Sequence, residues 1–488
     1  MAGNVLPVAN TIQLWQNKKL VSNLYQDDTN IRESAYRTLN RQNYSFGFGP
    51  VNMGSSAPSL NFNKDSIVNH VLVEFELPDL TALNISNGMG LSEGWAWQLV
   101  RRYSMQYSGS QALEIDGRQN FIRCMAECES KEKRQSLIAL GGNRVYLEAG
   151  VLKGADSDGK VRGAVLIYLP HSSVSGSKQI GYDCSQANSA PIIRLDLTSA
   201  EDLWTDLSIP GDTGAVSTDI VPAMRALNGR FHVGETAMID SINSRRDKVG
   251  PMGNAQSLMF FAYPNNFSKN FEVAGRANAV GEVAVSNTVP ITIDSFLNGS
   301  LQYLLLFVER LDGFDDSSGL TGGGATARPK KNPLNYVRLS DIKLTYGGGN
   351  TVYEAQTERI CSLIDTVVNP LDSTYYYNAL SRSGVADTVT VPTTPSGGYF
   401  YRIQISQFSE LYKMFSLLQT GANMGSDILR LSFKVIDNFT TQSGAAVRYR
   451  CNVQQVYQTS MTTARGNIKW DFVNPTPQAL PAQLSIST

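Results

Sequence analysis

The stretch YSMQYSGSQALEIDGRQNFIRCM, from Tyr103 to Met125, is matched feature by feature by DIKLTYGGGNTVYEAQTERICSLI, from Asp341 to Ile364. Each begins as a strand pattern and passes a tyrosine followed by a glycine-bearing turn. Each then continues as a short strand with an acidic residue and ends in a helix pattern. Because internal repeats determine the architecture of a chain, this match indicates a duplicated unit.

Two further matches keep the same order in both halves of the chain. One is a strand followed by a short helix, and the other is an aromatic strand that ends at asparagine and proline. The pairs are Arg194–Trp204 with Arg402–Tyr412, and Leu258–Asn265 with Ile468–Pro475. In the first of these pairs, Thr198 or Ser406 is expected to cap the helix. Chance likeness explains any one match, but three matches in one order favour a tandem duplication.

Short strand patterns dominate the chain, and helix patterns are few. The strand patterns lie at Ile67–Leu77, Trp95–Tyr107, Arg144–Glu148, Val161–Leu169, Ile192–Thr198, Gly281–Ile293, Leu301–Val308, Val337–Tyr346, Tyr399–Ser406, Ile428–Ile436 and Ala446–Val456. The helix patterns lie at Gln119–Leu140, Ser199–Trp204, Thr357–Val368 and Phe408–Gln419. Many strands separated by loops rich in Gly, Ser and Thr are typical of sandwiches and barrels.

The duplication and the strand count together predict an all-β fold. Each repeated unit of about 200 residues has room for eight antiparallel strands in two packed sheets, which is a jelly roll. We therefore expect two tandem eight-stranded antiparallel jelly rolls, a double jelly roll with short helices and long loop insertions. The expected division is an N-terminal arm over residues 1–44, a first roll over 45–270, a second roll over 271–475 and an extended C-terminal tail over 476–488.

The composition argues against several classes of protein. Of 488 residues, only 17% are charged, and 42 Lys and Arg balance 43 Asp and Glu to a net charge of −1. Such a chain has no overall field that would steer it to a polyanion or an anionic membrane. A near-zero net charge also favours association between molecules. The sequence thus predicts a large neutral globular protein, not a basic nucleic-acid binder or a disordered scaffold.

Membrane spanning, secretion and a disulfide framework are not indicated. Apolar runs such as Leu304–Val308 are far shorter than a membrane span, and the first twenty residues lack the apolar core of a signal peptide. The five cysteines are odd in number and sparse. Cys124 and Cys128 are spaced as a helical metal half-site, but no second close Cys/His pair exists, so plain packing is the favoured interpretation.

Residues suited to catalysis are scarce. The three histidines, His70, His171 and His232, are not spaced as metal ligands, and no H-E-x-x-H motif occurs. Neither a G-x-S-x-G nucleophile elbow nor a phosphate-binding loop is present. We therefore assign no catalytic, cofactor-binding or metal-binding residue and expect no cofactor.

Clusters of charged residues have ordinary explanations. Glu74 and Glu76 share one face of a strand pattern, as two glycosidase carboxylates might, but alternating charges are common on half-buried strands. The acids of Asp312–Asp316 do not fit a calcium loop, and a solvated loop is favoured. The basic clusters Arg245–Lys248 and Arg328–Lys331 are short, whereas phosphate binding needs a sustained basic patch with aromatics. The lack of an active site indicates a structural or binding protein.

The sequence resembles the double jelly-roll major capsid proteins of icosahedral double-stranded DNA viruses, the hexon-like coat proteins. The resemblance is carried by FELPDL at Phe75–Leu80, by the block Trp97–Asp116 and by the block Val337–Tyr353, within a duplicated pattern that covers nearly the whole chain after the arm. It implies a non-enzymatic subunit that forms homotrimers. Each trimer is a pseudo-hexagonal capsomer, and such capsomers tile a shell around the genome.

The resemblance also implies partners and a location. They are neighbouring capsomers, minor capsid or penton proteins, and an internal membrane that the N-terminal arm would contact; no sequence-specific nucleic-acid binding is implied. The protein would be assembled inside the host cell, without secretion, and would reside in the virion. Loops at one end would form outer towers, with candidates Gly150–Arg162, Ser172–Ala190, Asp312–Pro333 and Ser381–Gly398.

Two other classes of protein compete with this interpretation. A carbohydrate- or receptor-binding sandwich on a virion surface would need clustered exposed aromatics, and Tyr375–Tyr377 is the obvious cluster. A cupin-like enzyme would need histidine-rich metal sites, which three scattered histidines cannot supply. The capsid subunit is favoured over both.

Overall fold

The protein is described by a computed structural model. The described residues are 41–63, 66–78, 89–91, 93–106, 113–126, 131–148, 151–167, 169, 182–183, 191–199, 203, 205–206, 226–237, 257–277, 284–293, 300–311, 336–346, 349–357, 360, 376–377, 398–404, 422–423, 428–437, 439–441, 444–464 and 467–472.

Two sheets form the first roll. One sheet contains, side by side, β1 (Arg41–Asn52), β13 (Ala226–Ala237) and β3 (Ser66–Glu76), with β9 (Arg162–Ile167) and β10 (Tyr182–Asp183) both paired to β3. The other contains β2 (Leu60–Asn61), β11 (Ile192–Leu197), β5 (Val100–Gln106) and β6 (Leu113–Asp116). All these pairings are antiparallel. If the main strands are lettered B to I in chain order, the two sheets read B-I-D-G and C-H-E-F, which is the jelly-roll topology.

The second roll repeats this strand order. Its B-I-D-G sheet contains β14 (Ser257–Val273), β27 (Val447–Ala464), β18 (Ser300–Arg310) and β23 (Tyr401–Gln404), with β24 (Ala422–Asn423) added to β18 and β28 (Asn467–Phe472) added to β27. Its C-H-E-F sheet contains β17 (Val289–Ile293), β25 (Leu429–Asp437), β19 (Arg338–Tyr346) and β20 (Asn350–Ala355), with β16 (Ala284–Val285) also paired to β25. The predicted double jelly roll is confirmed.

Smaller sheets and three helices of the described residues lie outside the four main sheets. A four-stranded sheet is built from insertions of the first roll, in the order β12 (Thr205–Asp206), β4 (Met89–Leu91), β7 (Val145–Glu148) and β8 (Val151–Lys153). Two short pairs are β15 (Arg276–Ala277) with β26 (Thr440–Thr441), and β21 (Tyr376–Tyr377) with β22 (Gly398–Tyr399). The helices of the described residues are α3 (Trp95–Leu99), α4 (Gly117–Ala126) and α5 (Lys131–Leu140).

The three sequence matches have different outcomes. The first is confirmed for its strands, because β5 and β6 are strands E and F of one roll and β19 and β20 are strands E and F of the other. The helix expected after β20 lies outside the described residues, apart from Ile360. The second is wrong, since β11 is strand H of its roll whereas β23 is strand G. The third is also wrong, since β14 is strand B and β28 is an extra strand beside β27. Period-2 alternation is common to every half-buried strand, so it cannot tell strand G from strand H.

The predicted strand Trp95–Tyr107 is wrong in its first part, where Trp95–Leu99 forms α3. Gly94, just before the helix, has φ 75°, a left-handed conformation that turns the chain. Trp95 and Trp97 are fully buried, and the Trp97 indole donates a hydrogen bond to the carbonyl of Leu137 in α5. Tertiary packing thus overrides the β propensity of the aromatic residues.

Other predicted segments differ in detail. Gln119–Leu140 contains two helices, α4 and α5, in place of one. The Thr198 hydroxyl donates a hydrogen bond to the carbonyl of Gln98 at 2.7 Å, and most of the helix that Thr198 was expected to cap lies outside the described residues. Phe408–Gln419 lies outside the described residues, as do most of Thr357–Val368 and Ser199–Trp204.

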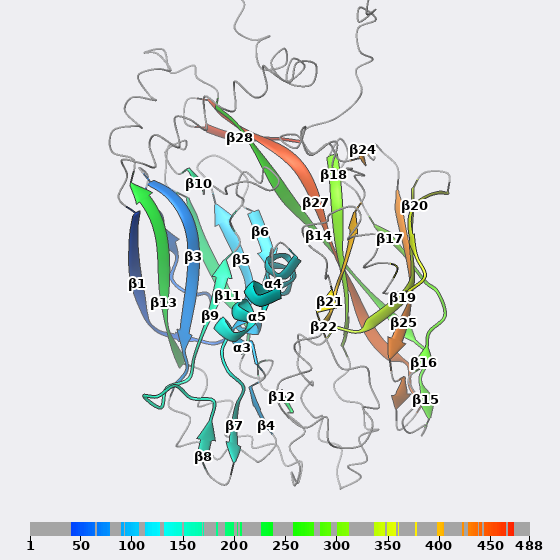
Figure 1. Ribbon diagram of the computed structural model, residues 1–488, viewed down its shortest axis with the longest axis horizontal. Coiled ribbons are helices and arrows are strands. Elements are labelled where there is room, and N and C mark those ends of the chain that lie inside the picture. Colours follow the sequence, from blue (N-terminus) through cyan, green and yellow to red (C-terminus); the bar gives the residue numbers. More distant parts are fainter. Residues whose placement is uncertain are drawn as a thin grey trace, which may run out of the picture.

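The two ends of the first roll differ. Figure 1 places the inserted sheet β12-β4-β7-β8 at one end and β10, β28 and the beginning of β1 toward the other. The predicted tower loop Gly150–Arg162 contains β8 and belongs to the first end. Of Ser172–Ala190, the structure describes β10, which pairs with Ile67 and Val68 at the start of β3, toward the opposite end.

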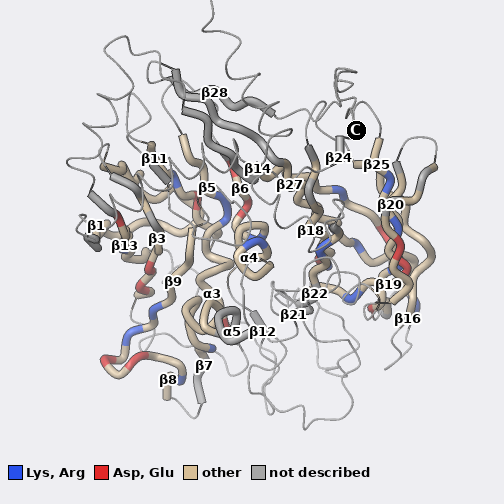
Figure 2. The backbone as a smooth tube through the Cα atoms, turned by 45° about the horizontal axis from the view of Figure 1, so that its top comes forward, with Lys and Arg blue, Asp and Glu red and all other residues tan. Residues whose placement is uncertain are grey.

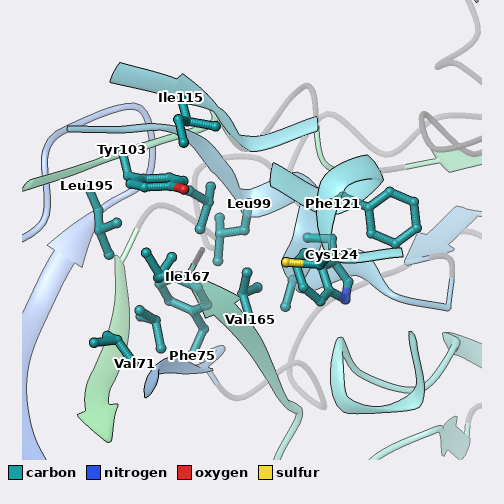
Figure 3. Packing of buried hydrophobic residues seen from close by; sticks show 14 of the residues in the cluster. Val71, Phe75, Leu99, Tyr103, Ile115, Phe121, Cys124, Val165, Ile167 and Leu195 are labelled. Atoms are coloured by element: carbon teal, nitrogen blue, oxygen red, sulfur yellow. The ribbon is translucent and has the colours of Figure 1, made fainter. Parts of the chain in front are cut away.

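The core of the first roll follows the alternation of its strands. Val71, Val73 and Phe75 of β3 are fully buried, and the residues between them face outward. Figure 3 shows Phe75 converging with Val165 of β9 on one interior, with α4 alongside. This core is continuous with side chains of the second roll, namely Tyr303, Leu305, Phe307, Tyr336, Phe400 and Val456. The second roll has its own core between its sheets.

Candidate assembly surface

Within the described residues, the groups considered for chemistry are held in ordinary packing or ion pairs. Nowhere in that part of the chain do three or more His, Cys, Asp or Glu gather as a metal site would need. Cys124 is buried in the core, as the packing interpretation predicts, and Cys128 lies outside the described residues. Across the described portion, no helix has the length and apolar character needed to cross a membrane.

Two of the histidines, His70 and His232, lie on the same face of the paired strands β3 and β13. His70 lies over Gly234, where a Cβ atom would be 2.2 Å from the imidazole. His232 Nε2 lies 2.8 Å from Glu74 Oε2 on the neighbouring strand. His171 lies outside the described residues.

The outer face of β18 is covered by the first roll. Glu309, on this face, is only 8% exposed. Its carboxylate accepts a hydrogen bond from Arg118 at the start of α4, and Arg450 of β27 lies 3.4 Å away in an ion pair without hydrogen-bond geometry. Figure 1 shows α4 lying between the rolls. This ion pair joins the two rolls at their junction, with Glu309 buried and the Arg118 side chain 32% exposed.

The local sequence places Arg118 where it can reach Glu309. The side chain of Asp116 accepts a hydrogen bond from the backbone amide of Arg118 at 2.9 Å, which caps the helix. Gly117 is required at the first position, because a Cβ there would lie 1.6 Å from the carbonyl oxygen of Val100. The cap therefore ends β6 and starts α4 at the edge of the second roll. Asn266 of β14 adds a hydrogen bond to the backbone carbonyl of Glu114 at 3.3 Å.

The first roll carries a counterpart of this face that nothing in the chain's described part covers. Glu74 of β3 is paired in register with Arg230 of β13, as Glu309 of β18 is paired with Arg450 of β27. The first buried residue is Leu227 in β13 and Val447 in β27, and in both strands the arginine follows it by three positions. Glu74 is 32% exposed, however, compared with 8% for Glu309.

The neighbouring strand B supports the same alignment. Gly229 and Tyr449 directly precede the two arginines. Gly229 is paired with Phe48 of β1, and Tyr449 is paired with Phe271 of β14. The sheet faces around Glu74 and Glu309 thus match in topology and register, and each pairs a glutamate with an arginine. We call the face around Glu74 the free face.

The free face is hollow and charged. A depression of about 440 Å³ lies over it, lined by Gly47, Phe48, Glu74, Glu76, Lys160, Arg162, Asn228, Gly229 and Arg230. Figure 2 shows acids and bases side by side around β3, β9 and the turn before β9. Arg162 holds that turn through ion pairs with Asp156, Asp158 and Glu76.

Glu76 is held as a carboxylate by two cations. Lys160 Nζ lies 2.8 Å from Oε1 and Arg162 Nε lies 2.9 Å from Oε2. The hydrogen bond from Lys160, and then that from Arg162, keep the pKa of Glu76 below its usual value. A glycosidase pair needs one carboxyl group that holds a proton, so this environment opposes the glycosidase interpretation of Glu74 and Glu76.

The Glu76 ion pairs are expected to make the free energy of unfolding depend on pH in the acidic range. Because the pKa in the folded state is depressed, the pairs stabilise the protein above the ordinary value of 4.5 and lose this effect as pH falls through the folded-state pKa. Between about pH 5 and pH 3, the melting temperature of the wild type should fall more steeply than that of Glu76→Gln. Scanning calorimetry would measure both, and parallel pH profiles would contradict the assignment.

Comparison with known proteins gives matches of fold only. No protein-family model matches the chain, and no curated protein matches its sequence. One similar structure is VP54 of the virus PBCV-1, a crystal structure fitted into a cryo-EM reconstruction of the virophage Sputnik. The similarity covers 89% of this chain and 97% of the VP54 chain, with 12% sequence identity and a TM-score of 0.53. A chain from the 3.5 Å cryo-EM structure of the Sputnik virophage is similar over 92% of both chains, with 12% identity and a TM-score of 0.50. The double jelly roll is therefore shared with proteins of virus particles.

Proposed function

We propose that this chain is a major capsid protein, a structural subunit that forms trimeric capsomers in an icosahedral shell around a double-stranded DNA genome. The observation that carries the proposal is the pair of equivalent sheet faces, one covered inside the chain and one free. Among the described residues, only one of these two matched faces is covered, and we propose that another copy covers the second. Head-to-tail contacts of this kind close into a ring or continue as a filament.

The match to VP54 supports the capsid assignment. That protein was fitted into the reconstruction of a virophage particle, and the present chain shares its fold over nearly the full length of both. By analogy, the chain would reside in the virion beside neighbouring capsomers and minor capsid or penton proteins, without enzymatic activity. No observation on the described residues favours the carbohydrate-binding alternative.

The two ends of the rolls suggest how the subunit stands in a shell. The sheet β12-β4-β7-β8 projects from one end and would face outward. The chain enters β1 near the other end, so the arm of residues 1–44 would face inward, toward an internal membrane if one is present. Residue 270, the expected boundary of the rolls, falls inside β14, which pairs with β27 along its whole length. The domain division we propose therefore begins the second roll at Ser257, and it keeps the tail at 476–488.

The mass of the protein in solution tests this proposal. Light scattering behind a sizing column should give a stable species at three times the 53.4 kDa of one chain. A monomer at every concentration that can be measured would overturn the capsomer proposal and favour a binding module.

A further inference from the structure

We infer that His70 makes the pairing of β3 with β13 sensitive to mild acid, so that the first roll loses stability when this imidazole takes up a proton. The inference concerns groups within one chain. It goes beyond the proposed function and can be tested whatever the assembly state of the protein.

His70 and His232 occupy diagonal positions on one face of the first roll. In the register of β3 with β13, His70 is opposite Gly234 and His232 is opposite Leu72. Diagonal neighbours on an antiparallel pair lie about 7–8 Å apart, within reach of aromatic side chains. The two histidines therefore share one stretch of the same strand pair, and their surroundings can be compared directly.

The two histidines differ in what a proton would bring them. His232 Nε2 lies 2.8 Å from Glu74 Oε2, so a charged His232 has a carboxylate beside it. Among the described side chains, none pairs with the imidazole of His70. A charge on His232 thus gains an ion pair, whereas a charge on His70 gains none.

The imidazole of His70 packs directly on the backbone of β13. A Cβ atom at Gly234 would lie 2.2 Å from Cε1 and 2.6 Å from Nδ1 of this ring, and Gly234 is itself buried. Because this contact removes part of the ring from water, burial keeps the pKa of His70 below its usual value. The rest of the residue is exposed, so a proton reaches the ring from solvent without opening of the roll.

The other charged groups around β3 do not compensate a charge on His70. The acids of this face are Glu74, next to His232, and Glu76, which Lys160 and Arg162 hold. Arg230 of β13 adds a further cation to the lining of the same depression. At the register positions of the neighbouring strands, Asp183 of β10 is opposite Ile67 and Arg41 of β1 is opposite Thr236. Both glutamates of the face thus already have cationic or imidazole partners.

The sign of the pH effect follows from the lowered pKa. The neutral ring stabilises the folded protein above the ordinary histidine value of 6.5, and this contribution is lost as pH falls through the folded-state pKa. The effect therefore lies at higher pH than the acid dependence expected from Glu76, which separates the two in one titration.

Thermal unfolding of the full-length protein tests the inference. Between about pH 7.5 and pH 5.5, the melting temperature of the wild type should fall by about 1–2 °C more than that of His70→Gln. His232→Gln is the matched control, because it makes the same chemical change on the same face. Its melting temperature should fall at least as much as that of the wild type, since it removes the histidine that has a carboxylate partner.

Gly234→Ala tests the contact itself while leaving both histidines in place. The three atoms nearest to the added Cβ all belong to the imidazole of His70, so the methyl group should push this ring into water. The variant should melt at a lower temperature than the wild type at neutral pH and should lose the acid dependence as His70→Gln does. Parallel pH profiles for the wild type and His70→Gln, or a full acid-dependent fall in Gly234→Ala, would overturn the inference.

Discussion

Replacing Trp97 by alanine is expected to lower the free energy of unfolding by about 3–5 kcal/mol. Trp97 is fully buried, its indole donates to the carbonyl of Leu137 at 3.0 Å, and its ring centroid lies 5.3 Å from that of Phe121. It therefore joins α3, α4 and α5, and its removal leaves a cavity that three short helices cannot close. Guanidinium unfolding followed by circular dichroism would measure the loss.

Trp97→Phe separates packing from hydrogen bonding at this position. The variant keeps a ring against Phe121 but loses the indole donor, so its cost should be smaller, about 1–2 kcal/mol. If Trp97→Ala cost less than about 1 kcal/mol, the helices would not be the packed unit described above.

Replacing Glu309 by alanine is expected to cost about 2–3 kcal/mol and to loosen the docking of the two rolls. The change leaves Arg118 and Arg450 without the carboxylate that both face. The cost is below that of a fully buried pair because the Arg118 side chain is 32% exposed. Guanidinium unfolding gives the free energy, and limited proteolysis would show separation of the rolls.

Glu354→Ala is the matched control for Glu309→Ala. Glu354 also faces a cation, Lys343 at 3.7 Å, but it is 55% exposed, so its removal should cost less than about 1 kcal/mol. Equal costs for the two variants would show that the Glu309 cluster is an ordinary surface ion pair and does not hold the rolls together.

The sequence allowed the fold class to be predicted because burial on one side of each sheet leaves a period-2 signature. The repeat of strands E and F was visible because turn glycines and strand lengths are local features of the sequence. Strands β1 and β13 were missed because glycines and polar residues interrupt the alternation of apolar residues in both. The α3 segment was misassigned because burial of its tryptophans against α4 and α5 is not local information.

The candidate surface was only partly visible in the sequence. Glu74 and Glu76 were correctly predicted to share a strand face, but their partners lie far along the chain, at His232, Lys160 and Arg162. The correspondence of Glu74 with Glu309 depends on the pairing register of two long-range ladders. No pattern along the chain contains that register.

Single-particle electron microscopy of the purified protein tests the central claim most directly. If three copies form the proposed capsomer, images down the symmetry axis should show a closed ring of six lobes with three-fold symmetry. Images of single two-lobed particles, or of open filaments, would contradict the capsomer that this structure supports.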